Sequence, residues 1–231
     1  MSSANSLTLA IEGSTYEGSV ALIDGSAVLA ERTLKDEEGA SPRGGRGERL
    51  LPAIAECLDE AGVKRGGIAR VVCGAGPGSF TSLRVAGSVA KGLAAGYGID
   101  LFAVSSLLLS ATGAQPPLPS GEYLSVLDAM RGEYYAAHIL VPRGGGAIQT
   151  EPPTIISSEV LDEIQVGSRD LKVIGPGQQM VTHPHARGVG PILDVIIRNG
   201  PVDLASWEPD YGRLAEAQVR WEATHGKKLT T

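Results

Sequence analysis

Aromatic residues and cysteines are scarce in this sequence. Phe, Trp and Tyr make up 4% of the 231 residues, so we expect a core built mostly from Val, Ile, Leu and Ala. The two cysteines, Cys57 and Cys73, each stand within an apolar pattern, which favours buried small side chains over a disulfide or thiol chemistry.

Signals for export and for membrane insertion are also missing. No positively charged side chain precedes Arg32, so the basic start of a secretory signal is absent. The longest charge-free stretch, residues 101–121, is interrupted by Pro116, Pro117 and Pro119, and it leaves too few apolar residues for the roughly 20 that a bilayer span needs. We therefore expect a cytoplasmic chain with no membrane contact.

Positive charge is in the minority. The chain has 20 Lys and Arg residues and 26 Asp and Glu residues, which gives a net charge of −6. This charge argues against a protein that binds nucleic acid over its whole surface. A hydrophobic fraction of 42% and a charged fraction of 20% are those of an ordinary globular chain, and its length suits one large domain or two compact ones.

The first half of the chain predicts three strands, then a helix, a strand, a helix and a strand. Asp24-Gly25 indicates a hairpin between the second and third strands, because glycine readily takes the positive φ that such turns need. The first helix ends at Gly62 and is expected to hold Pro52 in its first turn. The strands are expected at 7–11, 19–23, 27–34, 69–73 and 101–104, and the second helix from Ser79 to about Gly96.

The second half repeats this order in shortened form. Strands are expected at 123–127, 134–140, near 148 and at 171–174, with a helix at about 157–164. Antiparallel strands followed by parallel ones, reached through helical crossovers, indicate an α/β fold. We predict two ribonuclease-H-like domains with mixed sheets, residues 1–107 and a smaller domain of residues 108–231.

Two motifs carry a resemblance to a known family. The first is Glu12-Gly-Ser-Thr15 followed by Ser19-Val-Ala-Leu22, and the second is the run Gly74-Ala-Gly-Pro-Gly-Ser-Phe-Thr81. Over residues 7–141 the chain resembles the bacterial TsaB (YeaZ) family, with further agreement at Leu83, Arg84, Glu48-Arg-Leu-Leu-Pro52 and Asp128-Ala-Met-Arg131.

The resemblance implies a fold of the actin, Hsp70 and sugar-kinase type and a part in placing threonylcarbamoyladenosine beside the anticodon of tRNAs. Such a chain would be a non-catalytic subunit that stabilises a catalytic paralogue, TsaD, through a helical interface, with the ATPase TsaE joining the pair. It would meet tRNA through the complex and pair with itself when alone. It would hold no cofactor, nucleotide being possible only at the partner interface.

The residues themselves point to the same non-catalytic assignment. Catalytic relatives of this fold carry an aspartate where Glu12 stands, and a longer side chain would push a metal out of register with the phosphate path. The glycine-rich loop offers N–H groups at a helix N-terminus, so its candidate ligand positions are Gly74, Gly76, Gly78 and Ser79. A tight turn with close helix–strand packing is the preferred interpretation, because no Lys follows the loop as in a P-loop.

Neither the histidines nor the arginines predict a further site. His183 and His185 are expected in a solvated loop, and no two histidines stand four apart on a helix, the spacing of the metal motif in TsaD. The run Arg43-Gly-Gly-Arg-Gly47 is similar to an RNA-binding element, although a solvated loop is the preferred interpretation of a single copy. Related sequences commonly have His-Ser where this chain has Arg46-Gly47.

The two helices of the first half supply the candidate partner interface. Small side chains let two helix axes approach to about 8 Å, so one row of the second helix is predicted to face a partner: Ser82, Ala86, Ala90 and Ala94. The alternative is that Ala90 faces the domain's own sheet. The predicted interface also includes Leu50, Ile54, Val85, Val89 and Leu93, and the same patch would form the homodimer.

Two enzyme functions are alternatives. An ATP-dependent phosphotransferase of the same fold would use Glu12 and the glycine loop on Mg-ATP, but only Gly175-Pro-Gly177 hints at an adenosine-binding segment. A protease fails on chemistry, because no Ser or Cys has an identifiable His partner and the sequence has no zinc motif.

Overall fold

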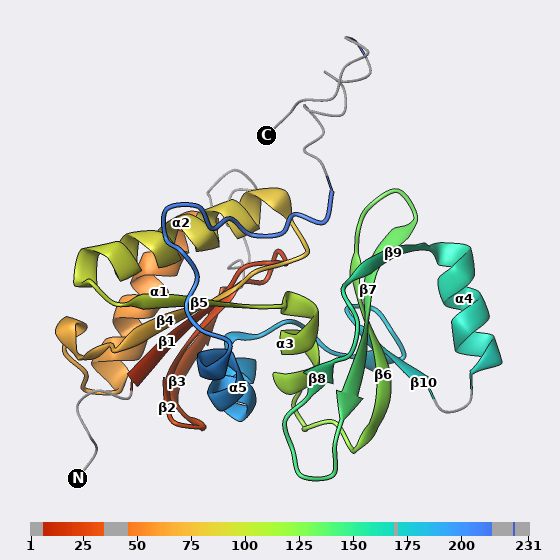
Figure 1. The fold of residues 1–231 in the computed structure, drawn as a ribbon, viewed down its shortest axis with the longest axis horizontal. Coiled ribbons are helices and arrows are strands. Elements are labelled where there is room, and N and C mark those ends of the chain that lie inside the picture. The colour runs from red at the N-terminus through yellow and green to blue at the C-terminus, as the bar shows by residue number, and fades with distance from the viewer. Residues whose placement is uncertain (1–6, 35–45, 169–170, 214–223, 225–231) are drawn as a thin grey trace, which may run out of the picture.

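Two mixed β-sheets, each covered by helices, make up the molecule in the computed structural model (Figure 1). The structure describes residues 7–34, 46–168, 171–213 and 224. The loop that contains Arg43 lies outside these residues.

The first sheet has five strands in the order β3-β2-β1-β4-β5. The first three are antiparallel, and β4 and β5 run parallel to β1. Four consecutive apolar residues of β2, at 20–23, are fully buried, which is the pattern of a strand covered on both faces. The bounds are β1 (Leu7–Glu12), β2 (Ser19–Asp24), β3 (Ala27–Thr33), β4 (Arg70–Gly74) and β5 (Asp100–Val104).

Helices α1 (Arg46–Glu60) and α2 (Phe80–Tyr97) cover one face of this sheet (Figure 1), and the short helix η1 (Arg65–Gly67) lies between α1 and β4 in the chain. Gly98 ends α2 in the left-handed conformation, with φ of 64°. The opposite face is covered by η2 (Ala186–Ile192) and α5 (Leu193–Arg198), whose Val189, Leu193 and Ile196 pack into the core.

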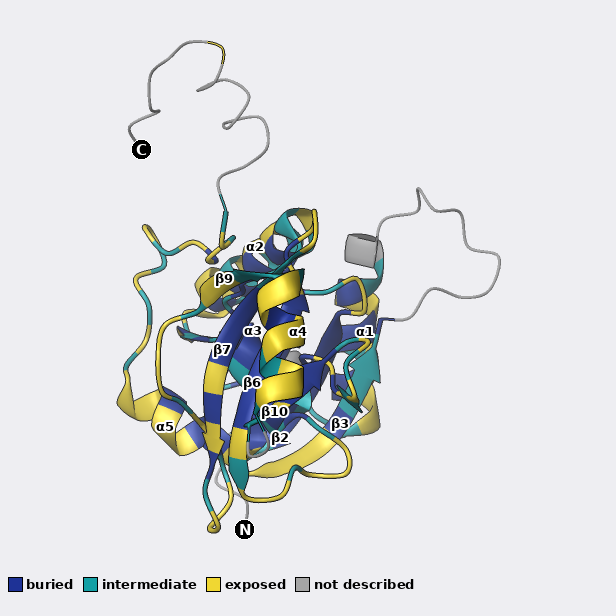
Figure 2. Ribbon diagram, turned by 90° about the vertical axis from the view of Figure 1, so that its right-hand side faces the viewer, coloured by how far each residue is buried: buried dark blue, intermediate teal, exposed yellow. Residues whose placement is uncertain are grey.

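The second sheet has the strand order β11-β10-β6-β7-β8, and β9 pairs with β7. Helix α3 (Ser106–Thr112) packs on one face and α4 (Ser158–Gly167) on the other. Figure 2 shows that the outer side of α4 is exposed while the strands behind it are buried. The bounds are β6 (Gly121–Asp128), β7 (Glu133–Val141), β8 (Ile148–Gln149), β9 (Thr154–Ser157), β10 (Leu171–Gly175) and β11 (Met180–Val181).

The predicted α/β fold with two mixed sheets is confirmed, and the sheets lie on either side of residue 107. The boundary there stays a prediction. The sequence did not indicate that the chain returns to the first sheet after β11, where residues 186–196 join its core. It also did not indicate α3, β9, β11, η2 or α5.

Two local expectations have clear outcomes. The predicted hairpin is present, with Gly25 at φ of 60° between β2 and β3. The predicted start of α1 is wrong, because the helix begins at Arg46 and Pro52 therefore lies in its interior. Pro52 lies on the exposed side of α1.

Among the described residues, none of the helices has the length and apolar character that a membrane crossing requires.

Candidate functional site

Glu12, the last residue of β1, is the most buried carboxylate near the glycine loop, with 1% of its surface exposed. One carboxylate oxygen accepts a hydrogen bond from the Ser14 N–H at 2.5 Å, and the other accepts one from the Ser106 hydroxyl at 3.0 Å. Burial raises the pKa of this carboxyl group, and the hydrogen bonds oppose that shift. Both oxygens are therefore held by the chain itself.

The glycine loop between β4 and α2 closes around Glu12. A Cβ atom on residue 74 would overlap the Glu12 carboxylate, and a Cβ on residue 78 would collide with the backbone of Ser14. Close packing therefore requires glycine at both positions, as the preferred sequence interpretation states.

The loop's N–H groups are largely engaged within the chain. The Ala75 N–H donates to the Val104 carbonyl at 2.7 Å, and the Gly76 N–H donates to the Ser106 hydroxyl at 3.1 Å. The Ser79 N–H donates to the Ser14 carbonyl at 2.7 Å. A phosphate group at this loop would have to replace these bonds, which supply the partners that buried N–H groups need.

The structure thus brings the candidate ligand positions Gly74, Gly76, Gly78 and Ser79 together around Glu12. The residues that sequence reasoning missed here are Ser106 and Asp210. Ser106 begins α3, and the Asp210 carbonyl lies where a Cβ on residue 76 would be. Both are distant in sequence from the loop, so no local pattern could indicate them.

The small-residue row of α2 has a different role from the one predicted. Ala86, Ala90 and Ala94 are at most 2% exposed and belong to the core under the first sheet. The expectation that they face a partner is corrected: small side chains here let α2 approach its own sheet. Leu50 and Ile54 of α1 are buried in the same core.

The other predicted interface residues lie at the border of this core. Val85, Val89 and Leu93 are partly buried and pack against it, and Ser82 is partly buried as well. Nearby, Leu51 of α1 is 55% exposed and Tyr97 of α2 is 40% exposed. The apolar surface that α1 and α2 offer to solvent therefore lies beside the predicted row.

A second row of small residues points outward from α2. We call Ser88, Gly92, Ala95 and Gly96 the outer α2 face; all four are exposed. A Cβ at Gly92 or Gly96 would meet no atom within 4 Å. Glycine inside a helix costs about 1 kcal/mol relative to alanine, and no contact among the described residues requires it at these positions. Sequence reasoning missed this face, and the glycines at 92 and 96 within the helical pattern are the signal that could have indicated it.

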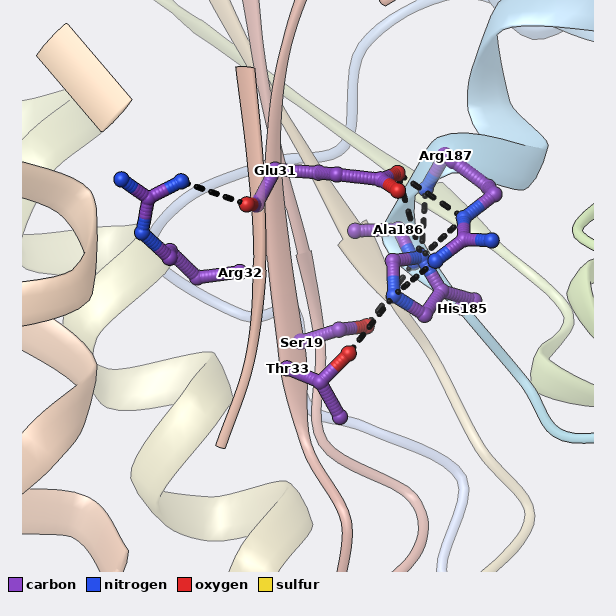
Figure 3. A network of polar contacts seen from close by, with 7 residues as sticks. All are labelled: Ser19, Glu31, Arg32, Thr33, His185, Ala186 and Arg187. Atoms are coloured by element: carbon purple, nitrogen blue, oxygen red, sulfur yellow. Dashed lines mark hydrogen bonds and ion pairs between the residues drawn. The ribbon is translucent and has the colours of Figure 1, made fainter. Parts of the chain in front are cut away.

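His185 does not lie in a solvated loop, as the sequence suggested, but is buried in a polar network (Figure 3). Its ring contacts the Thr33 hydroxyl at 3.2 Å and accepts the Arg187 N–H at 3.1 Å. Arg187 also pairs with Glu31 of β3 at 2.8 Å. Burial, and next the Arg187 cation, lower the pKa of His185 to about 3, so the ring stays neutral.

No group of three or more metal-ligating side chains occurs within the described ranges. His183 is exposed beside the buried Pro184, and His225 lies outside these ranges. The network around His185 joins the residues before η2 to the edge of the first sheet, because the Ala186 N–H also donates to Ser19 of β2 at 2.9 Å. We interpret it as a structural contact between two segments.

Known proteins are similar to this chain in both sequence and fold. Residues 28–149 match the model of the family TsaD: tRNA N6-adenosine threonylcarbamoyltransferase. The chain is 29% identical to the tRNA threonylcarbamoyladenosine biosynthesis protein TsaB of Escherichia coli, over 87% of this chain and 82% of that one. It is 26% identical to the Bacillus subtilis protein of the same name, over 92% and 96% of the two chains.

Solved structures agree with these matches. A Pseudomonas aeruginosa protein described as similar to peptidase YeaZ superposes with a TM-score of 0.74 and 26% identity, over 90% of this chain and all of that one. YeaZ from the same organism gives a TM-score of 0.72 at 23% identity, over 89% and 99%. The chain therefore belongs to the TsaD family, and within it to the TsaB (YeaZ) type.

Proposed function

We propose that this chain is a non-catalytic subunit of the assembly that makes threonylcarbamoyladenosine in tRNA, and that it binds and stabilises a catalytic TsaD subunit in the cytoplasm. Two of its relatives are named as TsaB proteins of this biosynthesis, which supports the same role here. In this proposal a TsaE ATPase joins the pair and tRNA is met through the complex. Alone, the chain pairs with itself.

The observation that carries the non-catalytic assignment is the closure of the glycine loop around Glu12. Its carboxylate oxygens accept hydrogen bonds from Ser14 and Ser106, and because only 1% of the residue is exposed, their remaining lone pairs are closed off from solvent. A metal ion would need these oxygens, and a phosphate would need the N–H groups that Val104, Ser106 and Ser14 already engage. Neither chemistry can begin without rearranging the core, which disfavours a phosphotransferase.

The outer α2 face is the best-supported surface for the partner. Its glycines lower the stability of the helix, and no contact within the described part of the chain requires them. Close approach of a second helix would explain why they are there. Half-buried Val85 and Val89 and exposed Leu51 lie on the same pair of helices and supply apolar area. The proposed interface is therefore the exposed outer α2 face and not the row of buried alanines.

The experiment is a binding measurement with purified TsaD. Gly92→Arg places a large charge on the outer α2 face, at a position where a Cβ would have no described atom within 4 Å. The dissociation constant should rise about 100-fold or more, as for a charge placed at the centre of an interface. Gly144→Arg is the matched control, because Gly144 is also exposed with open space around it but lies in the β7–β8 turn.

Circular dichroism should show that both variants are folded. Sizing chromatography should show that Gly92→Arg also weakens the homodimer, because both assemblies are proposed to use the same face. A Gly92→Arg protein that binds TsaD as tightly as the Gly144→Arg control would refute the interface while leaving the fold assignment intact.

A further inference from the structure

Residues 202–213, which follow α5, form a third connection between the two domains. We call this segment the strap. It follows α5 and returns along α2, as the blue trace in Figure 1 shows, and its last residues contact β7 of the second sheet. The other two connections are α3 with the residues after it, and residues 182–186 before η2.

The first half of the strap is anchored on the first domain. The Val202 N–H donates to the Leu101 carbonyl of β5 at 2.8 Å, and Lys91 of α2 donates to the Trp207 carbonyl at 2.9 Å. Trp207 packs against the core, and Pro209 lies so close to Gly87 that a Cβ there would touch the proline ring. Apolar burial therefore holds this end firmly.

The middle of the strap lies across the glycine loop. The Asp210 N–H donates to the Ala75 carbonyl at 2.7 Å. The Asp210 carbonyl occupies the space beside Gly76, whose φ of 92° already favours glycine. The loop and the strap thus fit one another at the backbone.

The end of the strap contacts the second sheet. The Tyr135 hydroxyl of β7 donates to the Tyr211 carbonyl at 3.1 Å, and Arg213 forms an ion pair with Glu133. The Tyr211 ring packs on Phe80 of α2, with ring centroids 4.5 Å apart. One residue therefore links the start of α2 to β7.

We propose that the strap is a clamp that fixes the two domains relative to each other across the glycine loop. Among the described residues, its contacts with the second sheet are one hydrogen bond, a partly exposed ion pair and the packing of Gly212 on Tyr135. Such contacts contribute less than the buried anchor on α2. Release therefore begins at the β7 end, and the domains then rotate about α3 and residues 182–186. This inference does not depend on the proposed function.

The test measures the distance between the domains in the full chain. Spin labels on Asp59→Cys and Glu163→Cys report from exposed positions on α1 and α4, and the native Cys57 and Cys73 are buried. With the intact strap we expect one narrow distance distribution. Tyr211→Ala combined with Arg213→Ala should broaden it or add a second distance, whereas Glu208→Ala, an exposed position in the strap, should leave it narrow.

An unchanged narrow distribution in the double variant would overturn the clamp. If that variant does not fold, Tyr135→Phe decides, because it removes one hydroxyl and little else. Exchange of the Asp210 amide hydrogen should then be about fivefold faster, the effect of losing one hydrogen bond. Exchange at the rate of the native protein would refute the proposal.

Discussion

A Cβ atom on residue 74 would overlap the carboxylate of Glu12, so the glutamate and the glycine at these positions depend on each other. The same carboxylate accepts hydrogen bonds from Ser14 and Ser106. The loop that could have held a phosphate is therefore shaped around a side chain of the protein itself.

Replacing Gly74 with alanine should destabilise the fold. The added methyl group must displace the Glu12 carboxylate, and overpacking of this kind costs about 1–3 kcal/mol. Urea unfolding measures the free energy change. Gly92→Ala is the control, because its Cβ meets open space; it should stabilise the chain by about 0.5–1 kcal/mol. Equal destabilisation by the two substitutions would contradict the packing described here.

Most of the fold could be predicted from the sequence. Apolar runs indicated the five strands of the first sheet and four of the second, with β9 and β11 missed, and Asp24-Gly25 indicated the first hairpin. Helix α5 was missed because only Leu193 and Ile196 of its six residues are buried, which gives too short a pattern to recognise. The return of the chain to the first sheet is a long-range contact that no local pattern contains.

The protein should lose stability as the pH falls below the ordinary pKa of histidine. The pKa of His185 is about 3 in the folded protein and near 6.5 when unfolded. Between these values the unfolded state binds a proton that the folded state does not, so stability falls with falling pH by up to about 1.4 kcal/mol per unit. Glu31, Arg187 and Thr33 surround the ring, and Arg187 opposes its protonation.

His185→Asn should remove this contribution. Urea unfolding at pH 7 and at pH 5 should show that the native protein loses about 2 kcal/mol more than the variant over this interval. The same pH dependence in both proteins would mean that His185 is protonated in the folded state.

The two cysteines should resist alkylation in the folded protein. Burial raises the pKa of the Cys57 thiol to about 11 and that of Cys73 still further, so neither forms much thiolate at pH 8. Mass spectrometry after iodoacetamide treatment should find no modification without urea and two modified thiols with it. Rapid modification of the native protein would show that this core opens readily.

The sequence indicated that the glycine loop makes a tight turn, but not which distant residues pack against that turn. Gly74, Gly76 and Gly78 were recognised as a tight turn, yet Ser106 and Asp210, which complete it, are separated from it by many residues. Likewise, the small residues of α2 were visible, but only the packing shows that Ala86, Ala90 and Ala94 face inward and Gly92 faces outward.

The isolated chain should hydrolyse ATP slowly if at all. With Glu12 and the loop N–H groups engaged internally, turnover should stay below about 0.1 per second, well under that of ordinary enzymes. Phosphate release from the purified chain measures this rate, and a heat-denatured sample gives the background. Faster turnover would favour the phosphotransferase alternative over the non-catalytic assignment.

Reconstituted tRNA modification tests the central claim most directly. The purified chain, purified TsaD and the two together are each assayed for threonylcarbamoyladenosine formation, with TsaE, ATP, tRNA and an activated threonylcarbamoyl donor present throughout. A non-catalytic subunit predicts no product from the chain without TsaD, and much more product from the pair than from TsaD without the chain. Product formed by the chain in the absence of TsaD, or TsaD activity that is unchanged when the chain is added, would contradict the account.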